Sequence, residues 1–149
     1  IGAGGVAKAV YFAIQSLDRM KIKIFNRTKS KAEDMINSHY SKTFQLDELD
    51  AHIKNDSVII NCTSIGLDDI SSPISLDLIS NNQIIIDVIY KVEKTSLINE
   101  STRKGSQVMD GIEMFIYQGL LSHELWFNEN IIDKVNINEI KEYLQLNIC

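Results

Sequence analysis

Apolar and polar residues of this chain follow two periodicities that alternate along the sequence. Residues 6–17 carry apolar side chains at the three- and four-residue spacing of a helix. Residues 21–25 (KIKIF) alternate between apolar and polar, as a short strand does, and residues 26–36 return to a helical pattern with Thr28 as the expected N-cap. The order predicted for this part of the chain is helix, strand, helix.

Two later runs are almost wholly apolar and β-branched. SVIINCTS (57–64) and QIIIDVIY (83–90) lack polar alternation, which is typical of strands buried on both faces of a parallel sheet. A short strand is also expected at 106–110, and helical segments at 76–79, at 96–104 with Gly105 ending the helix, at 112–127 and at 138–146. Alternating strands and helices predict an α/β fold, with residues 1–149 forming one domain.

Composition and charge narrow the range of partners. The chain has 149 residues, of which 44% are hydrophobic and 23% charged, so a sizeable core is expected. A net charge of −5 argues against nucleic acid as a partner, and no apolar run is long enough to predict a membrane span. Cys62, Cys149 and the three scattered histidines predict neither a disulfide framework nor a metal site, and the expected location is the reducing cytoplasm.

The chain opens on a glycine-rich segment, IGAGGVAKAV. Gly2, Gly4 and Ala7 match a dinucleotide-binding fingerprint: a tight turn, a close approach of backbone to a pyrophosphate, and close packing of the following helix. Together with the α/β pattern, this indicates a Rossmann-type doubly wound domain with a mostly parallel sheet, whose first strand is largely missing from this chain. The alternative is a purely structural role, in which the glycine turn joins a strand to a helix and binds no ligand.

The second predicted strand ends in Asn26, Arg27 and Thr28, followed by Lys29 and Lys31. An NAD-binding domain usually has a carboxylate here, which accepts hydrogen bonds from the ribose. A guanidinium instead suits a 2′-phosphate, so these residues favour NADP(H) over NAD(H). A merely solvated helix start is disfavoured, because cations at a helix N-terminus oppose its dipole.

Five segments occur in a diagnostic order: GAGGVA, NRTKSK, NCTSIG, DVIY and DGIEMFIYQG. In these segments, which span essentially the whole chain, the sequence resembles the C-terminal, NADP-binding half of the shikimate dehydrogenase family. The resemblance implies a two-domain oxidoreductase that reduces 3-dehydroshikimate to shikimate with NADPH in aromatic amino-acid (chorismate) biosynthesis. Substrate and nicotinamide would meet in a cleft between the domains.

The resemblance also assigns roles to individual positions. It places the pyrophosphate at Gly2, Ala3, Gly4, Gly5, Val6 and Ala7, and the 2′-phosphate at Asn26, Arg27, Thr28 and Lys31, where relatives often have Arg in place of Lys31. Thr63, Ser64 and Ile65 would lie along the cofactor, with Val88, Gly111 and Met114 near the nicotinamide. Tyr90 and Gln118 would contact the substrate.

Gln118 also stands out without reference to any family. It shares one helical face with Met114, Leu121 and Leu125, so its amide is expected on an otherwise apolar, buried stripe. A buried amide needs a partner, which could be a neighbouring backbone carbonyl or a ligand hydroxyl.

In relatives a substrate domain precedes the glycine turn and carries the catalytic Lys and Asp. We therefore expect no catalytic residue among residues 1–149, and no activity from these residues alone. Either the chain is part of a longer polypeptide or another segment fills the place of the first strand. The sequence leaves open a homodimer, a preference for quinate, a glutamyl-tRNA-type reductase, and an NADP(H)-binding sensor or interaction module without redox chemistry.

Overall fold

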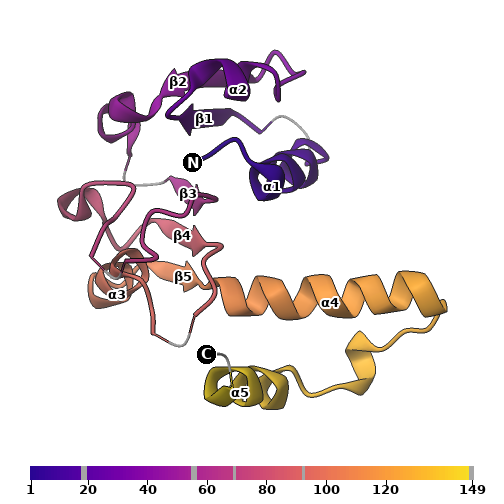
Figure 1. Cartoon of the computed structure of the whole chain (residues 1–149). Helices are drawn as coiled ribbons and strands as arrows, with labels where there is room; N and C mark the ends of the chain where they lie inside the picture. The colour runs from indigo at the N-terminus through magenta and orange to yellow at the C-terminus, as the bar shows by residue number, and fades with distance from the viewer. Residues whose placement is uncertain (18–19, 55–56, 69, 92, 148–149) are drawn as a thin grey trace.

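Parallel strands form the framework of the computed structural model, which describes residues 1–17, 20–54, 57–68, 70–91 and 93–147. Within these ranges the strands are arranged in two sheets, with orders β1-β2 and β3-β4-β5, and every pairing is parallel (Figure 1). The strands are β1 (Ile22–Asn26), β2 (Ser41–Gln45), β3 (Val58–Asn61), β4 (Ile84–Asp87) and β5 (Gln107–Met109). This arrangement confirms the predicted α/β class, although β2 was not predicted.

The segment Ile1–Gly2 connects the two sheets. Gly2 N donates to Phe25 O of β1 at 2.8 Å. On the other side, Ile1 N donates to Ile60 O of β3 at 2.7 Å, and Cys62 N donates to Ile1 O at 2.8 Å. The start of the chain therefore lies between β1 and β3, where the end of the first strand of a Rossmann-type sheet is expected (Figure 1).

The helices agree with the predicted ones to within a few residues, except that α2 is short. They are α1 (Gly5–Gln15), α2 (Lys29–Glu33), α3 (Ser96–Arg103), α4 (Gly111–Phe127) and α5 (Ile137–Asn147), with 3-10 turns η1 (Leu46–Glu48), η2 (Asp50–His52), η3 (Leu76–Leu78) and η4 (Ile132–Lys134). Thr28 occupies the predicted N-cap of α2, but its side chain makes no capping hydrogen bond. Gly105 follows α3 with φ 82°, a conformation that favours glycine.

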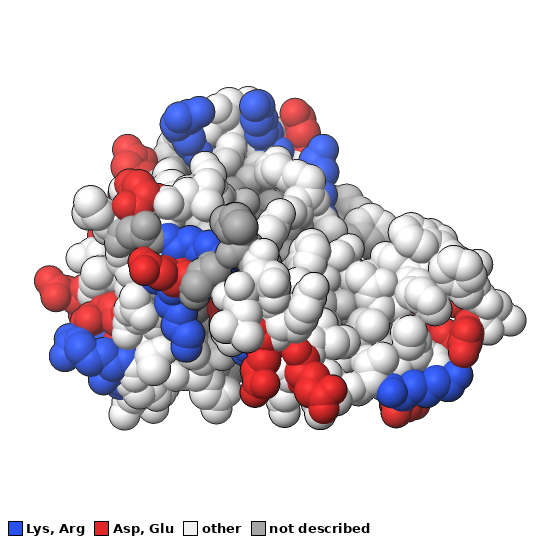
Figure 2. Space-filling model, turned by 60° about the horizontal axis from the view of Figure 1, so that its bottom comes forward, with Lys and Arg blue, Asp and Glu red and all other residues white. Residues whose placement is uncertain are grey.

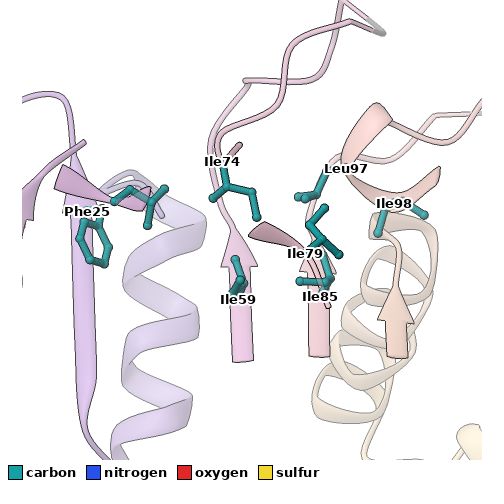
Figure 3. Packing of buried hydrophobic residues seen from close by; sticks show 8 residues of the cluster. Phe25, Ile59, Ile74, Ile79, Ile85, Leu97 and Ile98 are labelled. Carbon is teal, nitrogen blue, oxygen red and sulfur yellow. The ribbon is translucent and has the colours of Figure 1, made fainter. Parts of the chain in front are cut away.

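In the main core, α3 and the connecting segments pack against strands of both sheets (Figure 3). Ile59 and Ile85 are directly opposite each other in the β3–β4 register, and Leu97 and Ile98 of α3 cover them. Phe25, Leu49, Ile74 and Ile79 complete this cluster. A smaller cluster of Tyr11, Ile24 and Ala32 packs α1 and α2 against β1.

Burial of the β3–β4 ladder differs from the prediction. The strands were expected to be buried on both faces, but Val58 is 52% and Ile84 is 37% exposed, and Ile60 and Ile86 are only half-buried. These side chains point away from α3, because side chains alternate between the two faces of a strand. The described helices thus cover one face of this sheet more fully than the other.

Helix α4 projects from the carboxyl end of β5, and α5 folds back beneath it (Figure 1). Lys141 of α5 holds the two together through Glu113 Oε1 at 2.5 Å. The far half of α4 exposes large apolar side chains, among them Leu121, Leu125 and Trp126. Charged side chains are correspondingly sparse over much of the right half of Figure 2.

We expect Ile85→Ala to lower the free energy of unfolding by about 2–5 kcal/mol, because Ile85 is fully buried in the core and its truncation leaves a cavity. Urea denaturation measures this loss. Ile84→Ala on the same strand is the matched control, and it should cost at most about half as much, since Ile84 is already partly exposed. Equal losses would contradict the described orientation of β4.

Candidate functional site

Gly2 lies where backbone segments approach most closely. Its φ is 103°, and a Cβ built on it would lie 3.0 Å from Cys62 O and 3.1 Å from Thr63 Cγ2. Both the conformation and the space therefore require glycine. This agrees with the role predicted for the first glycine of the fingerprint.

Helix α1 begins directly after this turn and leaves its first N–H groups open. Gly4 is the N-cap and has no side chain to cap them, and Lys8 N makes the first helical bond, to Gly4 O at 3.0 Å. Cβ atoms built on Gly4 and Gly5 would meet open space, whereas Ala7 is buried. A helix start of this kind can bind an anion through backbone N–H groups and the helix dipole.

A cavity of about 170 Å³ lies beside the turn, lined by Ala3, Gly4, Asn26, Arg27, Thr28 and Lys31. Asn26 Nδ2 donates to Thr28 O at 2.8 Å and fixes the bend that follows β1. Within the described residues, no carboxylate forms an ion pair with Arg27 or Lys31, whereas the neighbouring Lys29 pairs with Glu33 at 3.8 Å. Two cations are thus available at this cavity.

A second cavity, of about 270 Å³, continues around the turn toward β3. It shares Ala3, Gly4, Asn26 and Arg27 with the first, and its other lining residues are Gly2, Phe25, Leu46, Cys62, Thr63, Ser64 and Ile65. Ten of the predicted site residues therefore line one continuous groove. Gly5, Val6 and Ala7 lie next to the groove, in the first turn of α1.

Phe25, Leu46 and Cys62 are lining residues that the sequence did not single out. Burial raises the pKa of the Cys62 thiol, which keeps it protonated. The other cysteine, Cys149, lies outside the described residues.

The remaining predicted residues form a second group at the end of β4 and the start of α4. A Cβ on Gly111 would lie 2.5 Å from Ile89 O, so only glycine allows α4 to begin against residues 88–90. Tyr90 is half-exposed and stacks on Phe115, with ring centroids 5.1 Å apart. Val88 lies just after β4 and Met114 in the first turn of α4, and both are half-buried. Neither residue lines either of the two cavities.

Gln118 corrects the prediction of a buried amide. Its side chain is exposed, and Nε2 donates to Phe115 O of the same helix at 3.0 Å. Leu121 and Leu125 on the same face are 50% and 83% exposed. The stripe is uncovered because α4 projects beyond the sheet, which helical periodicity alone cannot reveal. The sequence left two partners open for this amide, a backbone carbonyl and a ligand hydroxyl; in the structure the partner is the backbone carbonyl of Phe115.

Asn61 and Asp87 are polar residues that the sequence reasoning missed. They end β3 and β4 directly opposite each other, are 0% and 1% exposed, and are joined by Asn61 Nδ2 donating to Asp87 Oδ1 at 3.0 Å. Burial raises the pKa of Asp87, while hydrogen bonds from Thr95, Ile89 and Asn61 act against that rise. A visible signal was present: VIIN and IIID are apolar runs that each end in a polar residue.

The described helices include none with both the length and the apolarity to span a membrane. Comparison with known proteins is more specific. A family model described as shikimate / quinate 5-dehydrogenase matches residues 1–88. A shikimate dehydrogenase (NADP(+)) of Haloarcula marismortui is 30% identical over 97% of this chain and 54% of its own length. One from Maridesulfovibrio salexigens is 37% identical over 90% of this chain and 50% of its own length.

Solved structures agree with the sequence matches. The chain resembles shikimate 5-dehydrogenase of Thermus thermophilus, determined in complex with NADP(H) and shikimate, with a TM-score of 0.75, 25% identity, and coverage of 95% of this chain and 51% of that one. The chain thus spans about half the length of the relatives it matches. Since both the family model and the relatives cover most of these residues, the chain belongs to the shikimate / quinate 5-dehydrogenase family.

Proposed function

We propose that this chain is the NADP(H)-binding part of an enzyme that reduces 3-dehydroshikimate to shikimate. The observation that carries the proposal is the continuous groove around the glycine turn, with Arg27 and Lys31 at one end. The groove offers what a phosphorylated dinucleotide requires: backbone N–H groups for a diphosphate and two cations for a further phosphate.

The groove and the second group of residues, at the end of β4 and the start of α4, together suit the successive parts of NADP(H). Gly2 to Ala7 would hold the pyrophosphate, and Asn26, Arg27, Thr28 and Lys31 the 2′-phosphate. Thr63, Ser64 and Ile65 would lie along the cofactor, with Val88, Gly111 and Met114 at the nicotinamide, which when bound supplies or accepts a hydride. In the family, relatives such as that of Haloarcula marismortui are named for NADP(+).

The hydroxyl of Thr63 is already committed within the protein. It donates to Asn61 Oδ1 at 2.7 Å and accepts from Ile65 N at 3.1 Å. We therefore infer that Thr63 shapes the wall of the groove through its backbone and methyl group, rather than donating its hydroxyl hydrogen to the cofactor.

We assign substrate contacts to Tyr90, beside the start of α4, and to Gln118, about two turns into that helix; both side chains are exposed. The ring of Phe115 fixes Tyr90 by stacking. The Lys and Asp that act on the substrate carbonyl and hydroxyl are proposed to come from a substrate domain outside residues 1–149. Uncovered apolar side chains on α4, such as Leu121 and Leu125, support a further contact surface of this kind.

We expect the complete protein, including any residues before Ile1, to reduce NADP+ when shikimate is added. The measurement is the appearance of NADPH absorbance at steady state, with quinate tested in parallel and NAD+ as the alternative oxidant. NADPH binding without turnover of either substrate would favour a sensor or interaction module and contradict the proposed reaction.

Arg27→Ala should weaken NADPH binding roughly 10- to 100-fold, because it removes one partner of a charge-assisted hydrogen bond worth about 1.5–3 kcal/mol. NADH binding should change far less, since NADH lacks the 2′-phosphate. Calorimetric titration with both nucleotides checks this.

Lys29→Ala is the matched control for Arg27→Ala. It removes the same charge two residues away, but Lys29 pairs with Glu33 and does not line the groove, so its effect on NADPH should be small. An equal loss of NADPH and NADH affinity in Arg27→Ala would show that Arg27 does not bind the phosphate.

A further inference from the structure

We propose that Asn61 and Asp87 form a positioning pair that holds the cofactor loop (residues 63–65) and the nicotinamide loop (residues 88–90) in one fixed geometry. The inference rests on the proposed function and adds two residues to it. Neither side chain lines the groove, so both act through the loops that they hold.

Asn61 uses all of its hydrogen-bonding capacity on the cofactor loop and on Asp87. Its Oδ1 accepts from Thr63 N at 3.1 Å and from Thr63 Oγ1 at 2.7 Å. Its Nδ2 donates to Ile65 O at 3.1 Å and to Asp87 Oδ1 at 3.0 Å. With two bonds given and two received, the amide has a single orientation.

Asp87 makes the corresponding contacts on the nicotinamide side. Its Oδ1 also accepts from Ile89 N at 3.2 Å, and its Oδ2 accepts from Thr95 Oγ1 at 2.8 Å. Thr95 in turn caps α3 by accepting from Ile98 N at 3.3 Å. The three hydrogen bonds described for this carboxyl all come from donors, the pattern that suits a carboxylate.

The pair therefore links two loops that are separated by a strand and a long connection in sequence. The backbone adds to the link, since Val88 N donates to Asn61 O at 3.0 Å. Burying an amide against a carboxylate at the end of an apolar ladder costs more than burying two apolar side chains would. Placement of this costly pair between the loop that lines the groove (residues 63–65) and the proposed nicotinamide loop (residues 88–90) points to a positioning role.

The network depends on which groups donate hydrogen bonds and which accept them. A variant that replaces an acceptor with a donor therefore tests it. In Asp87→Asn the new side chain has only one acceptor oxygen. If that oxygen keeps Asn61 and Ile89, the new amide meets Thr95 Oγ1, whose hydrogen loses its acceptor. The side chain keeps its shape, so we expect a folded protein with a loosened network.

The experiment compares Asp87→Asn with Gln83→Met in the complete protein. Gln83 is also 1% exposed and lies just before β4, at the opposite end of that strand from the groove. It too makes three hydrogen bonds, from Ser80 N and to the carbonyls of Lys54 and Leu78. Gln83→Met removes all three of these bonds, so it is a control of at least equal structural cost without contact with either loop.

Asp87→Asn should lower kcat at least roughly tenfold per folded protein, because small misplacements of reacting groups carry large kinetic penalties. NADPH affinity should change less than about threefold, since the glycine turn and Arg27 are untouched. Gln83→Met should leave both values near wild type. Equal kinetic effects of the two variants would reduce the pair to a structural role and overturn the proposal.

Thr95→Val and Thr95→Ser are a second pair of variants. Valine removes the hydroxyl that donates to Asp87 and should lower kcat in the same direction, while serine keeps that hydroxyl and should restore kcat to within about twofold of wild type. Failure of serine to restore it, with the protein folded, would count against the network.

Amide hydrogen exchange measures the coupling between the two loops and does not require enzyme activity. In Asp87→Asn the amides of Thr63, Ile65 and Ile89 should exchange at least about tenfold faster, and in Gln83→Met they should not. Acceleration at Ile89 alone would show that the two loops are not coupled. If wild-type protein turns over neither shikimate nor quinate, the proposed function fails, whereas the exchange result still decides the coupling.

Discussion

The whole site depends on a few backbone hydrogen bonds made by Ile1 and Gly2. These two residues pair with β1 on one side and with β3 on the other, and so bring together two sheets that are otherwise separate in the described part of the chain. Strand edges require partners for their N–H and C=O groups, and the start of the chain supplies them where the groove forms. The glycine turn consequently emerges between the carboxyl ends of β1 and β3, with Arg27 on one side and Thr63 on the other.

Beneath the groove, the face of the sheet that carries the core changes from apolar to polar along its strands. Ile59 and Ile85 anchor the core, and two residues further along the same face stand Asn61 and Asp87. The apolar part provides stability through burial, whereas the polar part orients the loops that leave the sheet. This division places directional interactions only where orientation matters for the proposed chemistry.

Much of this could be predicted because the relevant patterns are local. The β-branched runs around β3 and β4, the glycine turn and the long α4 each appear within a short window of sequence. Strand β2 (Ser41–Gln45) was missed because Phe44 is its one large apolar residue. The exposure of Gln118 and the Asn61–Asp87 pair depend on which elements meet in space, and the latter joins residues 26 positions apart. No window around either residue contains that information.

The glycine at the start of α4 has a mechanical consequence. Because Gly111 lies directly against the backbone of Ile89, no side chain cushions the helix from the strand end. Helix α4 has 17 residues and is therefore about 25 Å long, and this backbone contact lies at its first residue. A partner that tilts the exposed far end of α4 would therefore also shift residues 88–90, and a shift of those residues would in turn tilt the helix.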